Sequence, residues 1–71
     1  MKHFRRDVHF TDREPVWFAV EYFDSGHLYE GASVAEAEEV FRTAHPHGHA
    51  GARLQAIGSL GETVWSERYE F

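Results

Sequence analysis

Hydrophobic and polar residues alternate with a period of two along most of this chain, the pattern of β-strands that bury one face. The alternation predicts strands over residues 3–10, 16–23, 27–30, 52–58 and 63–71. The segment 16–23 is the clearest, because it consists almost wholly of β-branched and aromatic residues. Its side chains fall on two predicted faces, one with Val16, Phe18, Val20 and Tyr22 and the other with Trp17, Ala19, Glu21 and Phe23.

One segment has the helical period instead. Apolar side chains at positions 34, 37, 40, 41 and 44 form a single stripe at about 100° per residue and predict a helix. Ser33 and Glu36 have the spacing of a capping box, in which the hydroxyl accepts the backbone N–H of Glu36. Pro46 disfavours the helical conformation of the residue before it, so we expect the helix to end near Ala44.

The order β-β-β-α-β-β predicts an α+β fold, a two-layer domain in which one helix packs on one face of an antiparallel sheet of about five strands. Residues 1–71 are expected to form a single domain, since no linker or repeat interrupts them. The predicted core consists of the inward apolar residues Phe4, Val8, Phe10, Val16, Phe18, Val20, Val34, Ala37, Val40, Phe41, Leu54, Ala56 and Trp65.

The second face of the sheet would carry Trp17, Glu21, Phe23, Ile57 and Val64. This is a large apolar area for a monomer to leave in water. It indicates a partner surface, a dimer face, or a register in which some of these residues point inward.

Charge separates the first residues from the rest. The net charge of the whole chain is −5, while residues 14–71 carry ten acids and three arginines, or −7. An acidic body disfavours direct binding to nucleic acid or to anionic membranes, and it favours a basic protein partner. We find no apolar run of about 20 residues and no apolar stretch after the basic start, so we expect no membrane span, no secretory signal and a cytoplasmic location.

The sequence offers no convincing catalytic set. Imidazoles at His45, His47 and His49 could converge on zinc or copper, but no Cys or acid in that loop completes a four-ligand site. We interpret the loop as a solvated connector, and we expect neither a metal nor another cofactor. The serines lack a nucleophile-elbow context, and paired carboxylates such as Glu36 and Glu39 lie on an exposed helix. The chain is therefore predicted not to be an enzyme.

Residues 15–71 combine a long strand, an Asp-Ser-Gly turn, a short strand, the helix entry Glu30-Gly31-Ala32-Ser33-Val34-Ala35-Glu36-Ala37-Glu38-Glu39-Val40 and a C-terminal hairpin. In layout and composition this resembles the compact sheet-plus-helix anti-CRISPR proteins of phages and mobile elements. The resemblance implies a small acidic inhibitor that binds a CRISPR-Cas effector of the Cascade type and blocks its nucleic-acid binding, by mimicking DNA charge or by occluding the groove.

The stretch G-x-S-x-x-E-A is also similar to the HicB-type antitoxin fold, with Gly31, Ser33, Glu36 and Ala37 at the strand-to-helix entry. That second resemblance implies an antitoxin-like function without catalytic activity. A third possibility is a dimeric protein-interaction module, which would use the face of Trp17 and Phe23 against a second copy. In each case we expect a monomer or a weak homodimer.

We expect a protein partner with a basic nucleic-acid-binding groove. The predicted partner-binding residues are the acids Glu36, Glu39 and Glu21, with Trp17 and Phe23 as apolar anchors, because aromatic residues carry much of the energy of interfaces.

Overall fold

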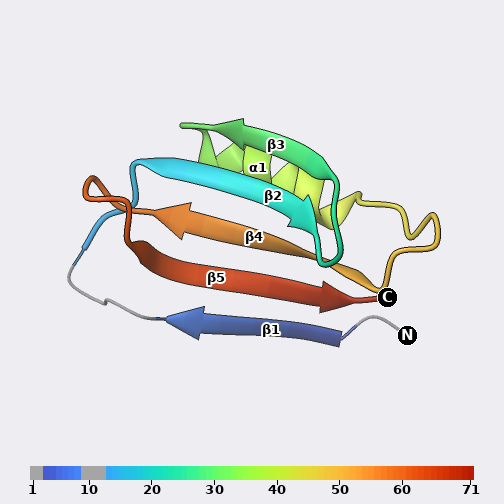
Figure 1. The fold of residues 1–71 in the computed structure, drawn as a ribbon. Helices are drawn as coiled ribbons and strands as arrows, with labels where there is room; N and C mark the ends of the chain where they lie inside the picture. The colour runs from blue at the N-terminus through green and yellow to red at the C-terminus, as the bar shows by residue number, and fades with distance from the viewer. Residues whose placement is uncertain (1–2, 9–12) are drawn as a thin grey trace.

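A computed structural model describes residues 3–8 and 13–71 of the chain, with side chains from Arg5 onward in these ranges. The elements are β1 (His3–Val8), β2 (Trp17–Tyr22), β3 (His27–Gly31), α1 (Val34–Arg42), β4 (Gly51–Ile57) and β5 (Thr63–Glu70). The structure confirms the predicted α+β layout of five antiparallel strands and one helix (Figure 1).

The five strands form one sheet in the order β1-β5-β4-β2-β3, so β4 is central and β1 and β3 are the two edges. Leu54 lies at the middle of the sheet, opposite Val20 of β2 on one side and Glu67 of β5 on the other. Because side chains alternate between faces along each strand, this register places Phe18, Val20 and Leu54 on one face and Trp17 and Glu21 on the opposite face.

The helix begins where the capping pattern predicts. Ser33 has an extended backbone, and its Oγ accepts a hydrogen bond from the Glu36 N–H at 3.2 Å. The helix ends at Arg42, two residues before the predicted end at Ala44. Thr43 closes it, since both the backbone N–H and the hydroxyl of Thr43 donate to the Glu39 carbonyl oxygen.

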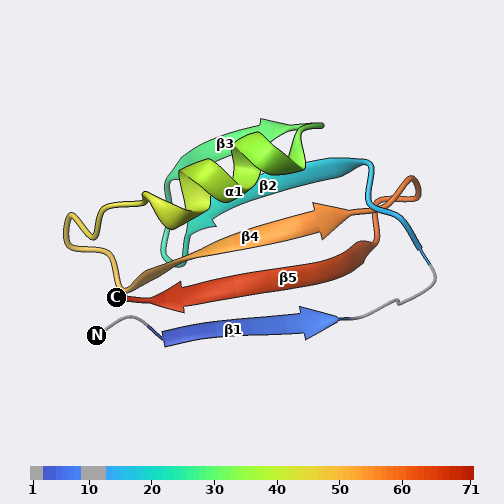
Figure 2. The ribbon, with the colours of Figure 1, turned by 180° about the vertical axis from the view of Figure 1, so that it is seen from behind.

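The helix packs against β2, β3 and β4, and on the same side of the sheet β5 and β1 extend beyond it (Figure 2). The core lies between these layers, where Phe41 is 2% exposed and Leu54 is fully buried. Its buried members are Phe18, Val20, Ala37, Phe41, Ala44, Ala52, Leu54 and Ala56. Six of these were predicted, Ala44 and Ala52 were not, and the predicted Val40 and Trp65 pack at the margin, partly buried.

Three residues predicted to lie in the core are exposed, because each lies at the margin of the contact between the helix and the sheet. Val8 is 54% exposed on the edge strand β1, and Val16 is 52% exposed just before β2 begins. Val34, at the first position of α1, is 39% exposed. The predicted core positions Phe4 and Phe10 lie outside the described side chains.

Val64 corrects the prediction for the opposite face, since it is 1% exposed rather than open to solvent. Ala56 pairs with Trp65 and Ile57 pairs with Thr63, so the register shifts at Val64 and the strict alternation of faces is interrupted. A pattern-based assignment with a strict period of two cannot anticipate this.

Among residues 3–8 and 13–71, no helix has both the length and the apolar character needed to cross a membrane.

We predict that Ser33→Ala lowers the free energy of unfolding by about 1 kcal/mol, because the Glu36 N–H loses its acceptor. Urea denaturation followed by circular dichroism measures this change. Ser59→Ala, in the exposed turn between β4 and β5, is the matched control and should leave the midpoint unchanged. Equal effects of the two substitutions would contradict the assigned cap.

Candidate functional site

The sheet face opposite the helix is open, and Trp17 is its most prominent aromatic residue. The Trp17 side of β2 faces away from α1, and Trp17 is 40% exposed beside Ile57 of β4. Its indole Nε1 donates to Glu30 Oε2 at 2.8 Å, and His27 Nε2 lies 3.9 Å from the other oxygen of the same carboxylate. The ring is thus held in place while its apolar surface stays accessible.

A second cluster forms around Arg53 in the central strand β4. The Arg53 Nη2 donates to the Phe23 carbonyl oxygen at 3.1 Å, and the guanidinium carbon lies 5.5 Å from the Phe23 ring centroid. Arg53 Nε lies 3.5 Å from Glu21 Oε1, a contact between opposite charges without hydrogen-bond geometry. Phe23 also packs over Gly51, where a Cβ would collide with its ring and with the Tyr69 carbonyl.

Arginines from three adjacent strands line up across this open face. Arg68 of β5 pairs in register with Arg5 of β1 on one side and with Arg53 of β4 on the other. Like charges at directly opposed positions repel, and here Asp7 reduces the repulsion. Asp7 accepts a hydrogen bond from Arg5 Nε at 3.1 Å and lies 3.9 Å from Arg68 Nη2. The open face therefore has mixed charge rather than the uniformly negative charge of a DNA mimic.

The outer face of α1 carries the negative charge instead. Glu36 and Glu39 are exposed, and neither forms an ion pair with the residues that the structure describes. Glu38, in contrast, is neutralised by Arg42 one turn later, at 2.9 Å. The helix thus presents two uncompensated carboxylates on the side of the molecule opposite Trp17.

A groove of about 310 Å³ runs between α1 and the uncovered half of the sheet. Its lining residues are Arg6, Glu38, Phe41, Arg42, Glu67 and Tyr69. The Phe41 and Tyr69 rings stack at 4.7 Å in its floor, and the Arg6 guanidinium lies 4.5 Å from the Trp65 ring centroid at its β1 side. Burial raises the pKa of Glu67, and the nearby Arg6 partly opposes that rise.

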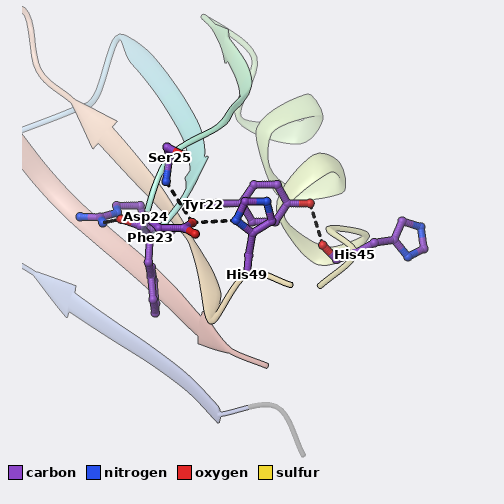
Figure 3. A network of polar contacts seen from close by, with 7 residues as sticks. Tyr22, Phe23, Asp24, Ser25, His45 and His49 are labelled. Carbon is purple, nitrogen blue, oxygen red and sulfur yellow. Dashed lines mark hydrogen bonds and ion pairs between the residues drawn. The ribbon is translucent and has the colours of Figure 1, made fainter. Parts of the chain in front are cut away.

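The loop of residues 45–49, which we call the histidine loop, contacts the β2–β3 hairpin through His49 (Figure 3). His49 Nδ1 lies 2.7 Å from Asp24 Oδ1, and its ring stacks on Tyr22 at 3.7 Å between centroids. The Tyr22 hydroxyl donates to the His45 carbonyl oxygen at 2.6 Å. The hydrogen bond from His49 lowers the pKa of Asp24, with the Ser25 N–H helping at 2.9 Å. His49 therefore holds its loop against the β2–β3 hairpin, a structural role that its position in the sequence did not reveal.

The other two histidines of the loop remain on the surface. His45 and His47 are exposed, with ring centroids 5.5 Å apart. Within the described ranges, no three His, Asp or Glu side chains come close enough together to hold a metal ion.

Comparison with known proteins gave no match to a family model, to a curated protein or to a solved structure.

The five predicted partner-binding residues divide between two sides of the molecule. Trp17, Glu21 and Phe23 share the open face, whereas Glu36 and Glu39 lie on the helix. Glu21 and Phe23 are partly buried against Arg53, so they also support the structure of this face. Sequence reasoning missed Arg53 and Arg68, although an arginine at an outward position of a strand was the available signal.

The Asp24–His49 pair predicts a pH-dependent contribution to stability. Because the folded-state pKa of Asp24 is lowered, its contribution is present above the ordinary carboxyl range and is lost as the pH falls through the folded value. Asp24→Asn should therefore flatten the fall in unfolding free energy as the pH drops below the ordinary carboxyl value of 3.8. Urea denaturation across this range measures the slope, with Glu14→Gln as the exposed control. An unchanged slope in Asp24→Asn would contradict the assignment.

Proposed function

We propose that this protein acts by binding another protein and not by catalysis, and that Trp17 is the anchor of one binding surface. The observation that carries the proposal is the open sheet face, where a large aromatic ring is 40% exposed yet fixed by its bond to Glu30. A rigid, half-exposed tryptophan loses little conformational entropy on binding, which is why such residues dominate interface energies.

The partner class that we propose is a nucleic-acid-binding protein with a basic groove, in particular a CRISPR effector of the Cascade type, whose nucleic-acid binding the protein would block. Support comes from Glu36 and Glu39, which are exposed and uncompensated, and from the net charge of −5. Such a charge distribution attracts a basic groove over long range and accelerates encounter. The arginine row of the open face favours the helix as the side that faces this groove.

An antitoxin-like or dimeric interaction module is the alternative, and one observation favours it. Trp17 and the two helix acids lie on opposite sides, so a partner bound at the helix leaves the Trp17 surface free for a second protein. The two functions make different demands: inhibition requires the helix acids, whereas a module built on the open face requires Trp17 alone.

The test is competition for a purified Cascade-type effector between this protein and the target DNA of the effector. Glu36→Lys with Glu39→Lys should slow association by about tenfold and weaken its dependence on salt, because steering acts on the rate of encounter. Trp17→Ala should instead accelerate dissociation if the open face also contacts the effector. Surface plasmon resonance separates the two rates.

Glu14→Lys with Glu70→Lys is the matched control, since it changes the net charge equally at two exposed acids away from the helix. If the control slows association as much as the helix variant, net charge alone steers binding and no helix site exists. If the parent protein leaves DNA binding by the effector unchanged at micromolar concentration, the inhibitor function is wrong.

A further inference from the structure

The strand β1 is an edge of the sheet with an unusually regular geometry. All six residues, His3–Val8, pair with β5 without any shift in register. An edge strand of this kind presents a row of backbone donors and acceptors that another strand can pair with. The opposite edge is a poorer template, because β3 has five residues and its pairing with β2 shifts between Val20 and Glu21.

The charges on β1 are complementary to themselves. Arg5 and Asp7 have opposite sign and lie two residues apart, so both side chains are on the open face of the sheet. Charged residues protect an edge when they repel a second copy, which requires equal signs at the positions that meet. In an antiparallel pair of two β1 strands centred on position 6, Arg5 of each copy faces Asp7 of the other. In this register the facing side chains of the two copies attract each other, whereas an edge protected against pairing would need them to repel.

The exposure of these side chains leaves them available for such pairing. The Arg5 side chain is 70% exposed although it donates to Asp7, and Asp7 retains an exposed fraction of 33%. Val8 is 54% exposed on the helix side of the same strand, an apolar residue that the fold of one copy leaves uncovered. Each observation indicates that, among the residues the structure describes, no strand covers the outer side of β1.

Arg6, at the centre of this pairing, already contacts β5 of its own copy. Arg6 faces Glu67 of β5 in register, and its guanidinium lies 4.5 Å from the Trp65 ring centroid. Two copies of Arg6 would meet at the two-fold axis, and their repulsion is reduced because each stacks on a tryptophan beside a carboxylate.

We propose that β1 pairs antiparallel with β1 of a second copy of this chain, with position 6 on the two-fold axis, to form a continuous ten-stranded sheet. A two-fold axis normal to the sheet keeps both helices on one side and both open faces on the other. The dimer thus goes beyond the proposed function and leaves Trp17, Glu36 and Glu39 accessible in each copy. Since two short edges bury little area, we expect a weak dimer that forms at high protein concentration.

The test uses sedimentation equilibrium of the full chain from about 1 µM to 1 mM, where the mass should rise from 8.2 kDa toward twice that value. Arg5→Asp makes both facing positions acidic, and Asp7→Arg makes both basic. Each variant alone should dimerise at least about tenfold more weakly than the parent, because attraction becomes repulsion at two symmetric sites.

An equimolar mixture of the two variants is the decisive sample. In a heterodimer, positions 5 and 7 are both acidic in one copy and both basic in the other. Each acid then faces an arginine across the axis, so the mixture should dimerise with parental affinity. A contact elsewhere on the surface would not be restored by mixing. Circular dichroism melting of each variant verifies that it is folded, and Arg42→Asp on α1 is the charge-matched control that should dimerise like the parent.

Three results would overturn the proposal. The first is a parent that stays at 8.2 kDa up to 1 mM. The second is a mixture of folded variants that remains monomeric while the parent dimerises. The third is a dimer that Trp17→Ala weakens and Arg5→Asp does not, which would place the contact on the open face. None of these results bears on binding to a nucleic-acid enzyme, so the proposed function is tested separately.

Discussion

One short helix must cover a five-stranded sheet, and this mismatch in size governs the rest of the structure. A helix of nine residues is about 14 Å long and about 10 Å wide, whereas five strands span roughly 20 Å. The helix therefore packs on one face of β2, β3 and β4, and it reaches β5 through the stack of Phe41 on Tyr69. Small residues at Ala37, Ala52 and Ala56, all fully buried, bring the layers close together, and Leu54 and Phe41 fill the space between them. Apolar side chains outside the contact between the helix and the sheet have to be covered by other side chains.

Arginine side chains cover aromatic rings on both sides of the sheet where the helix does not reach. Arg6 lies over Trp65 beside the helix, and Arg53 lies over Phe23 on the open face. In each case a long side chain shields an aromatic ring while its charged end stays near a carboxylate, Glu67 or Glu21. Phe23, which the sequence assigned to the face opposite the core, is thereby partly covered within a single copy. Trp17 is the exception, since only its indole nitrogen is engaged.

Local signals in the sequence predicted the elements well, because alternation, helical period and capping act over a few residues. The strand segments and the Ser33 cap are confirmed for this reason. The strand order was not predictable in the same way, since it depends on contacts between distant segments. Val8 and Val16 were assigned to the core because a period of two identifies a face without showing whether anything covers it. The pairing of His49 with Asp24 joins positions 25 residues apart, and no local pattern encodes it.

Local sequence patterns also do not reveal which residues form one binding surface. The structure shows that the acidic residues of α1 and Trp17 lie on opposite sides of the sheet. Exposed acids on α1 and a fixed tryptophan on the open face cannot meet one flat partner together, because the sheet lies between them. A dimer through β1 would place two copies of each surface on common sides of one sheet. A partner with repeated or extended sites could then engage two equivalent helices at once, and linked binding events gain affinity without any new contact. A small domain with weak individual contacts would benefit most from this arrangement, since one short helix offers few contacts to any partner.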